Sequence, residues 1–230
     1  MHRFFIDRLE SDQLIVTDPV DVHQLKKVVR VRPGEPVELV YQEKLYLGEL
    51  MEVGREAIFK QLKEQAVEDS GVRISLIQGY PKGSKMSEIL MHGTECGIEH
   101  FVIAQMDRSI ARLDPTKRDR YERIVKDAAK QSKRLSIPRI SFEELSGIDF
   151  SQYDRVYFLF EGSKTPLATD STDRSIALVI GPEGGFSDQE IDLLRSLPNV
   201  AEATLGQRIY RTETAGLVAC VIIRDRLEAR

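Results

Sequence analysis

The chain has 230 residues, enough for one large domain or two small domains with their own hydrophobic cores. Hydrophobic residues make up 41% and charged residues 30% of the sequence, as in an ordinary soluble globular protein, and the longest apolar run, residues 215–223, is far too short to span a bilayer. The net charge of −4 does not by itself suggest a nucleic-acid partner.

The first 70 residues are predicted to form a small β-barrel domain. Short apolar runs alternate there with turn signals such as Asp18-Pro19 and Pro33-Gly34. We expect strands over residues 3–6, 14–17, 37–41, 44–53 and 56–62. A short helix is expected over residues 21–29, starting near Asp18 or Asp21. The polar stretch 64–71 is the expected linker.

From residue 71 to residue 230 the pattern changes to alternating strands and helices. Continuous apolar runs predict strands over residues 72–77, 98–104, 155–160, 175–180 and 200–204. Helices are expected over residues 84–96, 115–134, 186–197 and 212–227. Gly97 is expected to end the first helix, and Ser187 with Glu190 should form a capping box at the start of the third, next to a hydrophobic staple of Phe186 and Ile191. The pattern predicts an α/β domain whose mostly parallel sheet is covered on both faces.

A basic band runs over residues 108–139, with eleven Lys or Arg against four Asp or Glu. It includes the amphipathic helix 115–134. The apolar face of that helix is formed by Tyr121, Ile124, Val125, Ala128 and Ala129. Its basic residues fall largely off that face: Arg118, Arg123, Lys126, Lys130 and Lys133. The band is either a footprint for phosphates or a solvated helix face.

Three unusual loops follow strands, and ligands of open parallel sheets bind at loops beyond the carboxyl ends of strands. They are residues 160–162, 181–185 and 205–215. Their glycines permit close approach of the backbone to a ligand and positive φ angles. The second loop alone would also fit a tight turn between strand and helix. Together the three loops predict a shared pocket for a small molecule.

Other kinds of site find little support in the sequence. The two cysteines, Cys96 and Cys220, lie in unrelated segments, which favours a reducing cytoplasm. The four histidines lack the spacing of metal ligands, so we expect no metal. No dinucleotide-binding or Walker A glycine motif is present, no signal peptide is expected, and no nucleophile elbow is found.

Several motifs resemble those of one known family. Residues 181–187 are similar to its I-G-P-E-G-G-[FL]-S signature, and residues 205–215 to its L-G-x-R-[IV]-L-R-T-E-T-A signature. Residues 82–86 resemble K-G-x-K-M, and residues 128–134 resemble A-A-E-Q-S-x-R. The chain therefore resembles the RsmE-type 16S rRNA uridine-N3 methyltransferases of the SPOUT (trefoil-knot) superfamily. It departs from them in having Tyr210 for Leu and Lys130 for Glu.

The resemblance implies an N-terminal PUA-like β-barrel for RNA and a C-terminal α/β domain with a deep trefoil knot. It also implies a homodimer, S-adenosylmethionine as the cofactor, and N3 of a specific uridine in 16S rRNA of the small ribosomal subunit as the methyl acceptor, in the cytoplasm during ribosome biogenesis. The implied cofactor-binding residues come from the three loops and their flanks: Phe160, Glu161, Gly162, Ile180, Gly181, Pro182, Glu183, Gly184, Gly185, Leu205, Gly206, Ile209, Tyr210, Arg211, Thr214 and Ala215. Candidates for holding RNA phosphates are Arg3, Arg30, Arg32, Lys82, Lys85, Arg108, Arg112 and Arg134.

Two residues are candidates for catalysis. Loss of the uridine N3 proton puts negative charge on O2 and O4, and the fixed charge of Arg211 would stabilise it. Arg211 would alternatively form a structural pair with Glu213 or Glu183. Glu213 is a candidate base, or else part of the cap of the last helix. Two other functions stay open: a methyltransferase of the same superfamily acting on another RNA position, and a non-catalytic rRNA-binding assembly factor.

Overall fold

The computed structural model describes residues 2–67 and 70–228 of the chain, which divides into two compact units. The first unit contains residues 1–68 together with residues 129–137, and the second contains residues 69–128 and 138–230. The sequence predicted a first domain of residues 1–70, and it contained no indication that the later segment 129–137 belongs to the first unit.

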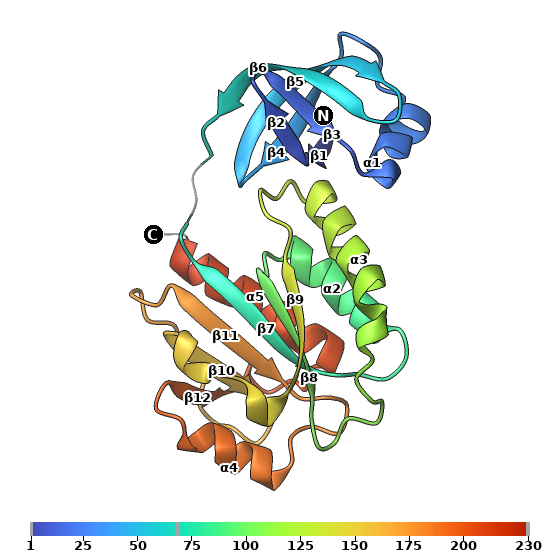
Figure 1. The fold of residues 1–230 in the computed structure, drawn as a ribbon. Coiled ribbons are helices and arrows are strands. Elements are labelled where there is room, and N and C mark those ends of the chain that lie inside the picture. Colours follow the sequence, from blue (N-terminus) through green and yellow to red (C-terminus); the bar gives the residue numbers. More distant parts are fainter. Residues whose placement is uncertain (1, 68–69, 229–230) are drawn as a thin grey trace. The chain divides into compact units, whose positions relative to one another are not determined.

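The first unit is a six-stranded curled sheet with the strand order β1-β4-β5-β6-β3-β2 (Figure 1). The strands are β1 (Arg3–Phe5), β2 (Arg8–Glu10), β3 (Gln13–Val16), β4 (Pro36–Tyr41), β5 (Lys44–Val53) and β6 (Ala57–Gln65). β1 and β4 are parallel, and the other neighbours are antiparallel. Phe4, Leu39 and Phe59 are fully buried in its core. Strand β2 was not predicted, because its side chains are mostly exposed and leave no apolar run.

A short helical segment follows β3. Helix α1 (Pro19–His23) continues directly into η1 (Gln24–Val29), a turn of π-helix. The side chain of Asp18 caps α1 by accepting a hydrogen bond from the backbone of Val20 at 2.8 Å. Arg30 ends η1 in the left-handed conformation with φ +57°. The predicted helix is therefore present, and Asp18 rather than Asp21 caps its start.

Segment 129–137 is attached to the rest of the first unit by buried ion pairs and hydrogen bonds. The ammonium of Lys130 lies 2.6 Å from Asp21 Oδ1 and 3.0 Å from Gln24 Oε1, and Lys130 and Asp21 are both buried. Arg3 pairs with Glu38 at 3.0 Å and donates to the backbone carbonyl of Lys133. The sequence placed Lys130 in a basic band that was either a phosphate footprint or a solvated helix face; Lys130 is instead buried, because α1 supplies a carboxylate for it.

The second unit is built on a six-stranded sheet in which all neighbours are parallel, with the order β12-β10-β11-β7-β8-β9 (Figure 1). The strands are β7 (Arg73–Gly79), β8 (His100–Gln105), β9 (Arg139–Glu144), β10 (Arg155–Leu159), β11 (Ser175–Ile180) and β12 (Val200–Ala203). The predicted parallel sheet is confirmed. Strand β9 was missed, because this edge strand has only one fully buried residue and carries charges at both ends.

Helices cover both faces of this sheet. Side chains of α2 (Lys85–Glu95), α3 (Arg118–Gln131) and α5 (Thr212–Glu228) share one hydrophobic cluster with strand residues such as Leu76 and Leu178. Helix α4 (Asp188–Ser196) packs in a second cluster with the next residues along the same strands, Ile77 and Val179. Because side chains alternate between the faces of a strand, the two clusters lie on opposite faces. None of the helices over residues 2–67 and 70–228 is long and apolar enough to cross a membrane.

The local signals at two helix ends are confirmed. Gly97 follows α2 with φ +93°, a conformation that side chains rarely adopt. At the start of α4, Ser187 Oγ accepts a hydrogen bond from the backbone N–H of Glu190 at 3.2 Å, and the Glu190 carboxylate accepts one from the backbone N–H of Ser187 at 2.8 Å. Phe186 and Ile191, the predicted staple, are buried in the same cluster.

Removing the Lys130 ammonium should destabilise the first unit strongly. A buried carboxylate left without its partner costs about 3–5 kcal/mol, so we expect Lys130→Met to lower the free energy of unfolding by about that amount in urea denaturation. The double variant Asp21→Asn with Lys130→Met removes both charges and should recover much of the loss. Equal losses in the single and double variants would contradict this role of the ion pair.

Candidate active site

Three loops of the second unit line one cavity of about 1050 Å³. They follow β10, β11 and β12, which are neighbours in the sheet (Figure 1). All three strands are parallel, so their carboxyl ends meet at one edge, where ligands of such sheets bind. The volume is at the upper end of the range of roughly 300–1,000 Å³ for pockets that bury a small ligand. The structure thus brings the three loops that the sequence singled out into one pocket.

Most of the residues proposed for cofactor binding line this cavity. The lining residues among them are Phe160, Glu161, Ile180, Gly181, Pro182, Glu183, Gly184, Gly185, Leu205, Gly206, Ile209, Tyr210, Arg211 and Ala215. Gly162 and Thr214 are not among the residues that line it. Gly162 lies against the ring of Phe160, where a Cβ atom would come within 2.6 Å of Cε1.

Glycine is required at several points of the pocket wall. Gly185 and Gly206 have φ angles of +68° and +101°, which side chains rarely adopt. At Gly184 an added Cβ would meet the Arg108 side chain at 3.0 Å. At Gly185 and Gly206 the loop backbone itself lines the cavity, and no described residue beyond the chain neighbours has an atom within 4 Å of an added Cβ.

A buried threonine anchors two of the three loops. Thr212 Oγ1 accepts a hydrogen bond from the side chain of Gln78 at 2.8 Å and donates to the Gly181 carbonyl at 2.7 Å. Gln78 is fully buried at the end of β7. The start of α5 is thereby fixed to the loop after β11. Thr212 was not among the proposed site residues, although it lies inside the 205–215 motif.

Two carboxylates and one ammonium form the charged side of the pocket. Lys85 Nζ lies 3.0 Å from Glu183 Oε1 and 3.1 Å from Glu213 Oε2. The backbone N–H of Lys82 also donates to Glu183 Oε1, at 3.3 Å. The other oxygen, Glu183 Oε2, is buried and has no hydrogen-bond partner among the described residues, which is unusual for a buried polar atom.

These contacts set the protonation states of the cluster. The Glu183 carboxylate, aided by Glu213, raises the pKa of Lys85. Burial alone would raise the pKa of the Glu213 carboxyl, but its own backbone N–H and Lys85 outweigh that effect and hold the pKa below its usual value. Lys85 is therefore a cation and Glu213 an anion near neutral pH. A carboxylate with a lowered pKa is a weak base, which argues against Glu213 as the group that removes a proton.

Arg211 lies just before α5 and presents its guanidinium to solvent at the pocket. Its side chain is 84% exposed, and Nη1 is 3.9 Å from Glu213 Oε1. Of its two expected structural partners, only Glu213 is within ion-pair distance, and at the outer limit. The guanidinium is therefore available to a ligand. Glu213 itself lies in the first turn of α5, where a negative charge is stabilised by the helix dipole.

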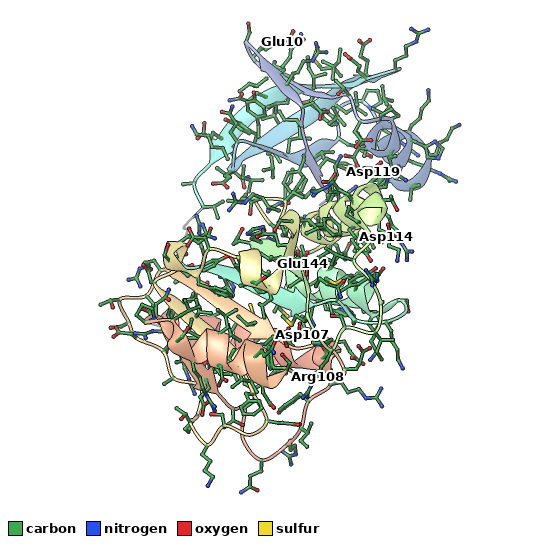
Figure 2. All side chains as sticks on the ribbon, turned by 60° about the horizontal axis from the view of Figure 1, so that its bottom comes forward. Glu10, Asp107, Arg108, Asp114, Asp119 and Glu144 are labelled. Carbon is green, nitrogen blue, oxygen red and sulfur yellow. The ribbon has the colours of Figure 1, made fainter. Side chains whose placement is uncertain are left out.

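The loop after β8 closes another side of the pocket. Asp107 and Arg108 lie side by side in this loop (Figure 2). Arg108 Nη1 donates to the Gly184 carbonyl at 3.2 Å, and Asp107 accepts a hydrogen bond from Ser187 Oγ at 2.5 Å. The backbone N–H of Asp107 donates to Glu190 at 2.9 Å. Arg108, proposed as a phosphate ligand, is therefore also a wall residue of the cavity.

The proposed phosphate ligands differ in their availability. Arg3 is buried with Glu38, and Lys85 is paired with two carboxylates, so neither offers a free charge. Arg134 is half-buried. The remaining candidates are exposed: Arg30 and Arg32 in the first unit, and Lys82, Arg108 and Arg112 in the second. Sequence reasoning missed Lys26 and Lys27, which are exposed on η1 next to Arg30.

Comparison with known proteins identifies the class. The model of the family described as RNA methyltransferase domain matches residues 68–224, so the chain belongs to this family and is an RNA methyltransferase. It is similar to the ribosomal RNA small subunit methyltransferase E of Bacillus subtilis, with 29% identity over 99% of this chain and 98% of the relative. The resemblance drawn from the sequence motifs is confirmed.

Solved structures agree with this assignment. A ribosomal RNA small subunit methyltransferase E from Neisseria gonorrhoeae, solved bound to S-adenosyl methionine, matches with a TM-score of 0.86 and 27% identity over 98% of both chains. A methyltransferase from Legionella pneumophila, 24% identical over 97% of both chains, shares the fold with the same TM-score of 0.86.

The Thr212 hydroxyl should be essential to the stability of the pocket. In Thr212→Val the buried Gln78 amide and Gly181 carbonyl each lose a partner, and an unsatisfied buried polar group costs about 1–3 kcal/mol. We expect a loss of that order in the free energy of unfolding of the second unit, measured in urea. Thr212→Ser keeps the hydroxyl and serves as the control. A Val variant as stable as the Ser variant would contradict the prediction.

Proposed function

We propose that this protein transfers the methyl group of S-adenosylmethionine to N3 of a specific uridine in the 16S rRNA of the small ribosomal subunit. The observation that carries the proposal is the pocket formed by the loops after β10, β11 and β12, in a chain that belongs to an RNA methyltransferase family. The names of its relatives supply the rRNA of the small subunit as the substrate class.

The pocket suits the cofactor in size and chemistry. Its backbone-lined wall at Gly184 and Gly185 admits a flat, closely packed group. The buried, unpartnered Glu183 Oε2 can accept a hydrogen bond from an ammonium. When bound, S-adenosylmethionine supplies a methyl group on a positively charged sulfur, which leaves as a neutral thioether. The residues of the wall hold it in line with the acceptor, and this positioning is the main contribution to catalysis.

Arg211 is the proposed catalytic residue. Uridine N3 carries a proton and becomes a nucleophile only when that proton is lost to water or to a base. The negative charge then spreads to O2 and O4. The exposed guanidinium of Arg211 at the pocket can donate two hydrogen bonds to such oxygens. Glu213, with its lowered pKa, is not proposed as the base.

The rest of the chain is proposed to present the RNA. N3 lies on the Watson–Crick edge, so the uridine must be unpaired or turned out of its helix. We propose that the curled sheet of the first unit is a PUA-like barrel whose exposed Lys26, Lys27, Arg30 and Arg32 hold phosphates. In the second unit, Lys82, Arg108 and Arg112 serve the same purpose close to the pocket loops.

Two architectural features complete the proposal. We propose that the second unit contains a deep trefoil knot and that two copies of the chain form a homodimer. Val221 on α5 is half-exposed, so this helix offers an apolar side chain that a second copy could cover. Action in the cytoplasm, on the assembling small subunit, stays a prediction.

Arg211→Ala tests the catalytic assignment. Loss of one donor aimed at developing charge typically costs 10²–10³-fold in rate, so we expect kcat to fall by roughly 100-fold or more. Binding of S-adenosylhomocysteine, measured by calorimetry, is the parallel readout: a much smaller loss there than in kcat is expected if the guanidinium serves the uridine base, and an equal loss would show that Arg211 holds the cofactor instead. Unchanged turnover would eliminate Arg211 as the catalytic residue.

Nucleoside mass spectrometry tests the function itself. The protein and S-adenosylmethionine are incubated with unmodified small subunits and, separately, with naked 16S rRNA. We expect 3-methyluridine, and the better substrate shows at which stage of assembly the protein acts. A 2′-O-methylated nucleoside would instead indicate a different acceptor atom. Cofactor binding without any methylated product would favour a non-catalytic assembly factor.

A further inference from the structure

Lys85 joins three separate parts of the second unit at the pocket. It is the first residue of α2, after the turn that follows β7, while Glu183 belongs to the loop after β11 and Glu213 to the first turn of α5. Its ammonium lies 3.0 Å from Glu183 Oε1 and 3.1 Å from Glu213 Oε2. The exposed fractions of the three side chains, 26%, 19% and 16%, leave them only partly screened by water.

The helix itself gives no reason for a lysine at this position. The N-terminus of a helix carries partial positive charge, so a cation in its first turn is unfavourable. Ser84, the N-cap of α2, makes no side-chain capping bond that would offset this effect. The cost is offset by the two carboxylates, which would otherwise repel each other. The ion pairs with Glu183 and Glu213 therefore explain why a lysine lies at this position.

Arg211 is the other cation within reach of Glu213. Its Nη1 already lies 3.9 Å from Glu213 Oε1, yet its side chain remains 84% exposed. The Glu213 carboxylate is thus shared unequally: Lys85 is close, and Arg211 is at the limit of an ion pair. If Lys85 were neutral, the unpaired carboxylate would attract the guanidinium, which would then lie on the pocket wall with its charge neutralised.

We propose that Lys85 is a positioning residue for the reaction: by occupying the carboxylates of Glu183 and Glu213, it keeps the Arg211 guanidinium free to reach the substrate base. The inference rests on the proposed function, in which Arg211 stabilises the charge on uridine. It assigns Lys85 a role different from the phosphate contact expected from the sequence.

The state of Arg211 can be measured without cofactor or RNA. Phenylglyoxal modifies unpaired arginines, and peptide mass spectrometry reports the rate at each position. In Lys85→Met we expect the rate at Arg211 to fall by about threefold or more, as for formation of an ion pair of about 0.6 kcal/mol. Arg208, an exposed residue of the same loop, is the internal control and should react at an unchanged rate. Lys85→Arg keeps the charge and should retain the wild-type rate at Arg211.

A second substitution separates this role from simple structural support. In the double variant Lys85→Met with Glu213→Gln, the competing carboxylate is gone. The labelling rate at Arg211 should therefore recover.

Methyl transfer should change in the same order as the labelling rate. We expect kcat to fall by about tenfold or more in Lys85→Met, which corresponds to about 1.4 kcal/mol, and to recover at least in part in the double variant. Thermal unfolding checks that each variant is folded, and Lys85→Gln replaces Lys85→Met if the latter is not.

Two results would overturn the inference. One is an unchanged labelling rate at Arg211 in Lys85→Met, whatever happens to turnover. The other is a double variant that recovers neither labelling nor transfer, which would show that Lys85 or Glu213 acts by another route. A wild-type protein that transfers no methyl group to uridine would instead refute the proposed function, while the labelling experiment would still decide whether Lys85 keeps Arg211 unpaired.

Discussion

The parallel direction of β10, β11 and β12 is the constraint on which the rest of the site depends. Parallel neighbours end at the same edge of the sheet, so the chain leaves it side by side after Leu159, Ile180 and Ala203, which are far apart in the sequence. The chain can then build one cavity from three short loops. Thr212 fixes two of these loops to each other through one hydroxyl, which bonds both Gln78 and Gly181.

Two carboxylates of the pocket, those of Glu183 and Glu213, share the ammonium of Lys85. Two carboxylates and one lysine ammonium form a compact group with one excess negative charge, and the arginine just before α5 is left outside it. Lys85 thus forms the structural ion pairs, while the Arg211 guanidinium remains available to a substrate. The low pKa of Glu213 follows from the same arrangement and explains why an acidic side chain beside the site is not automatically a base.

Much of the architecture was predictable from the sequence, for identifiable physical reasons. The apolar runs over β7, β8, β10 and β11 are buried on both faces, so their hydrophobicity is continuous and easily recognised. The capping box at Ser187 and Glu190 is a local interaction and needs no tertiary context. Strands β2 and β9 escaped detection because they lie at sheet edges and are largely polar.

The partners of charged side chains were not predictable in the same way. Arg3, Lys85 and Lys130 looked like surface cations, because helical or strand periodicity says nothing about a carboxylate that arrives from a distant segment. Asp21 is 109 positions from Lys130, and Glu38 is 35 positions from Arg3. Only the fold brings these pairs together. Arg30 and Arg112 are exposed, and their contact with RNA phosphates stays a prediction.

The contribution of residues 129–137 to the first unit has a consequence for the order of biosynthesis. The six strands of the curled sheet are complete once residue 65 has left the ribosome, but Asp21 and Glu38 have no cations from this segment until residues 130 and 133 emerge. The ion pairs of Asp21 with Lys130 and of Glu38 with Lys133 therefore form only after about 65 further residues have been translated. The first unit is therefore complete only after residue 137 has emerged, when residues 69–128 of the second unit have already been translated.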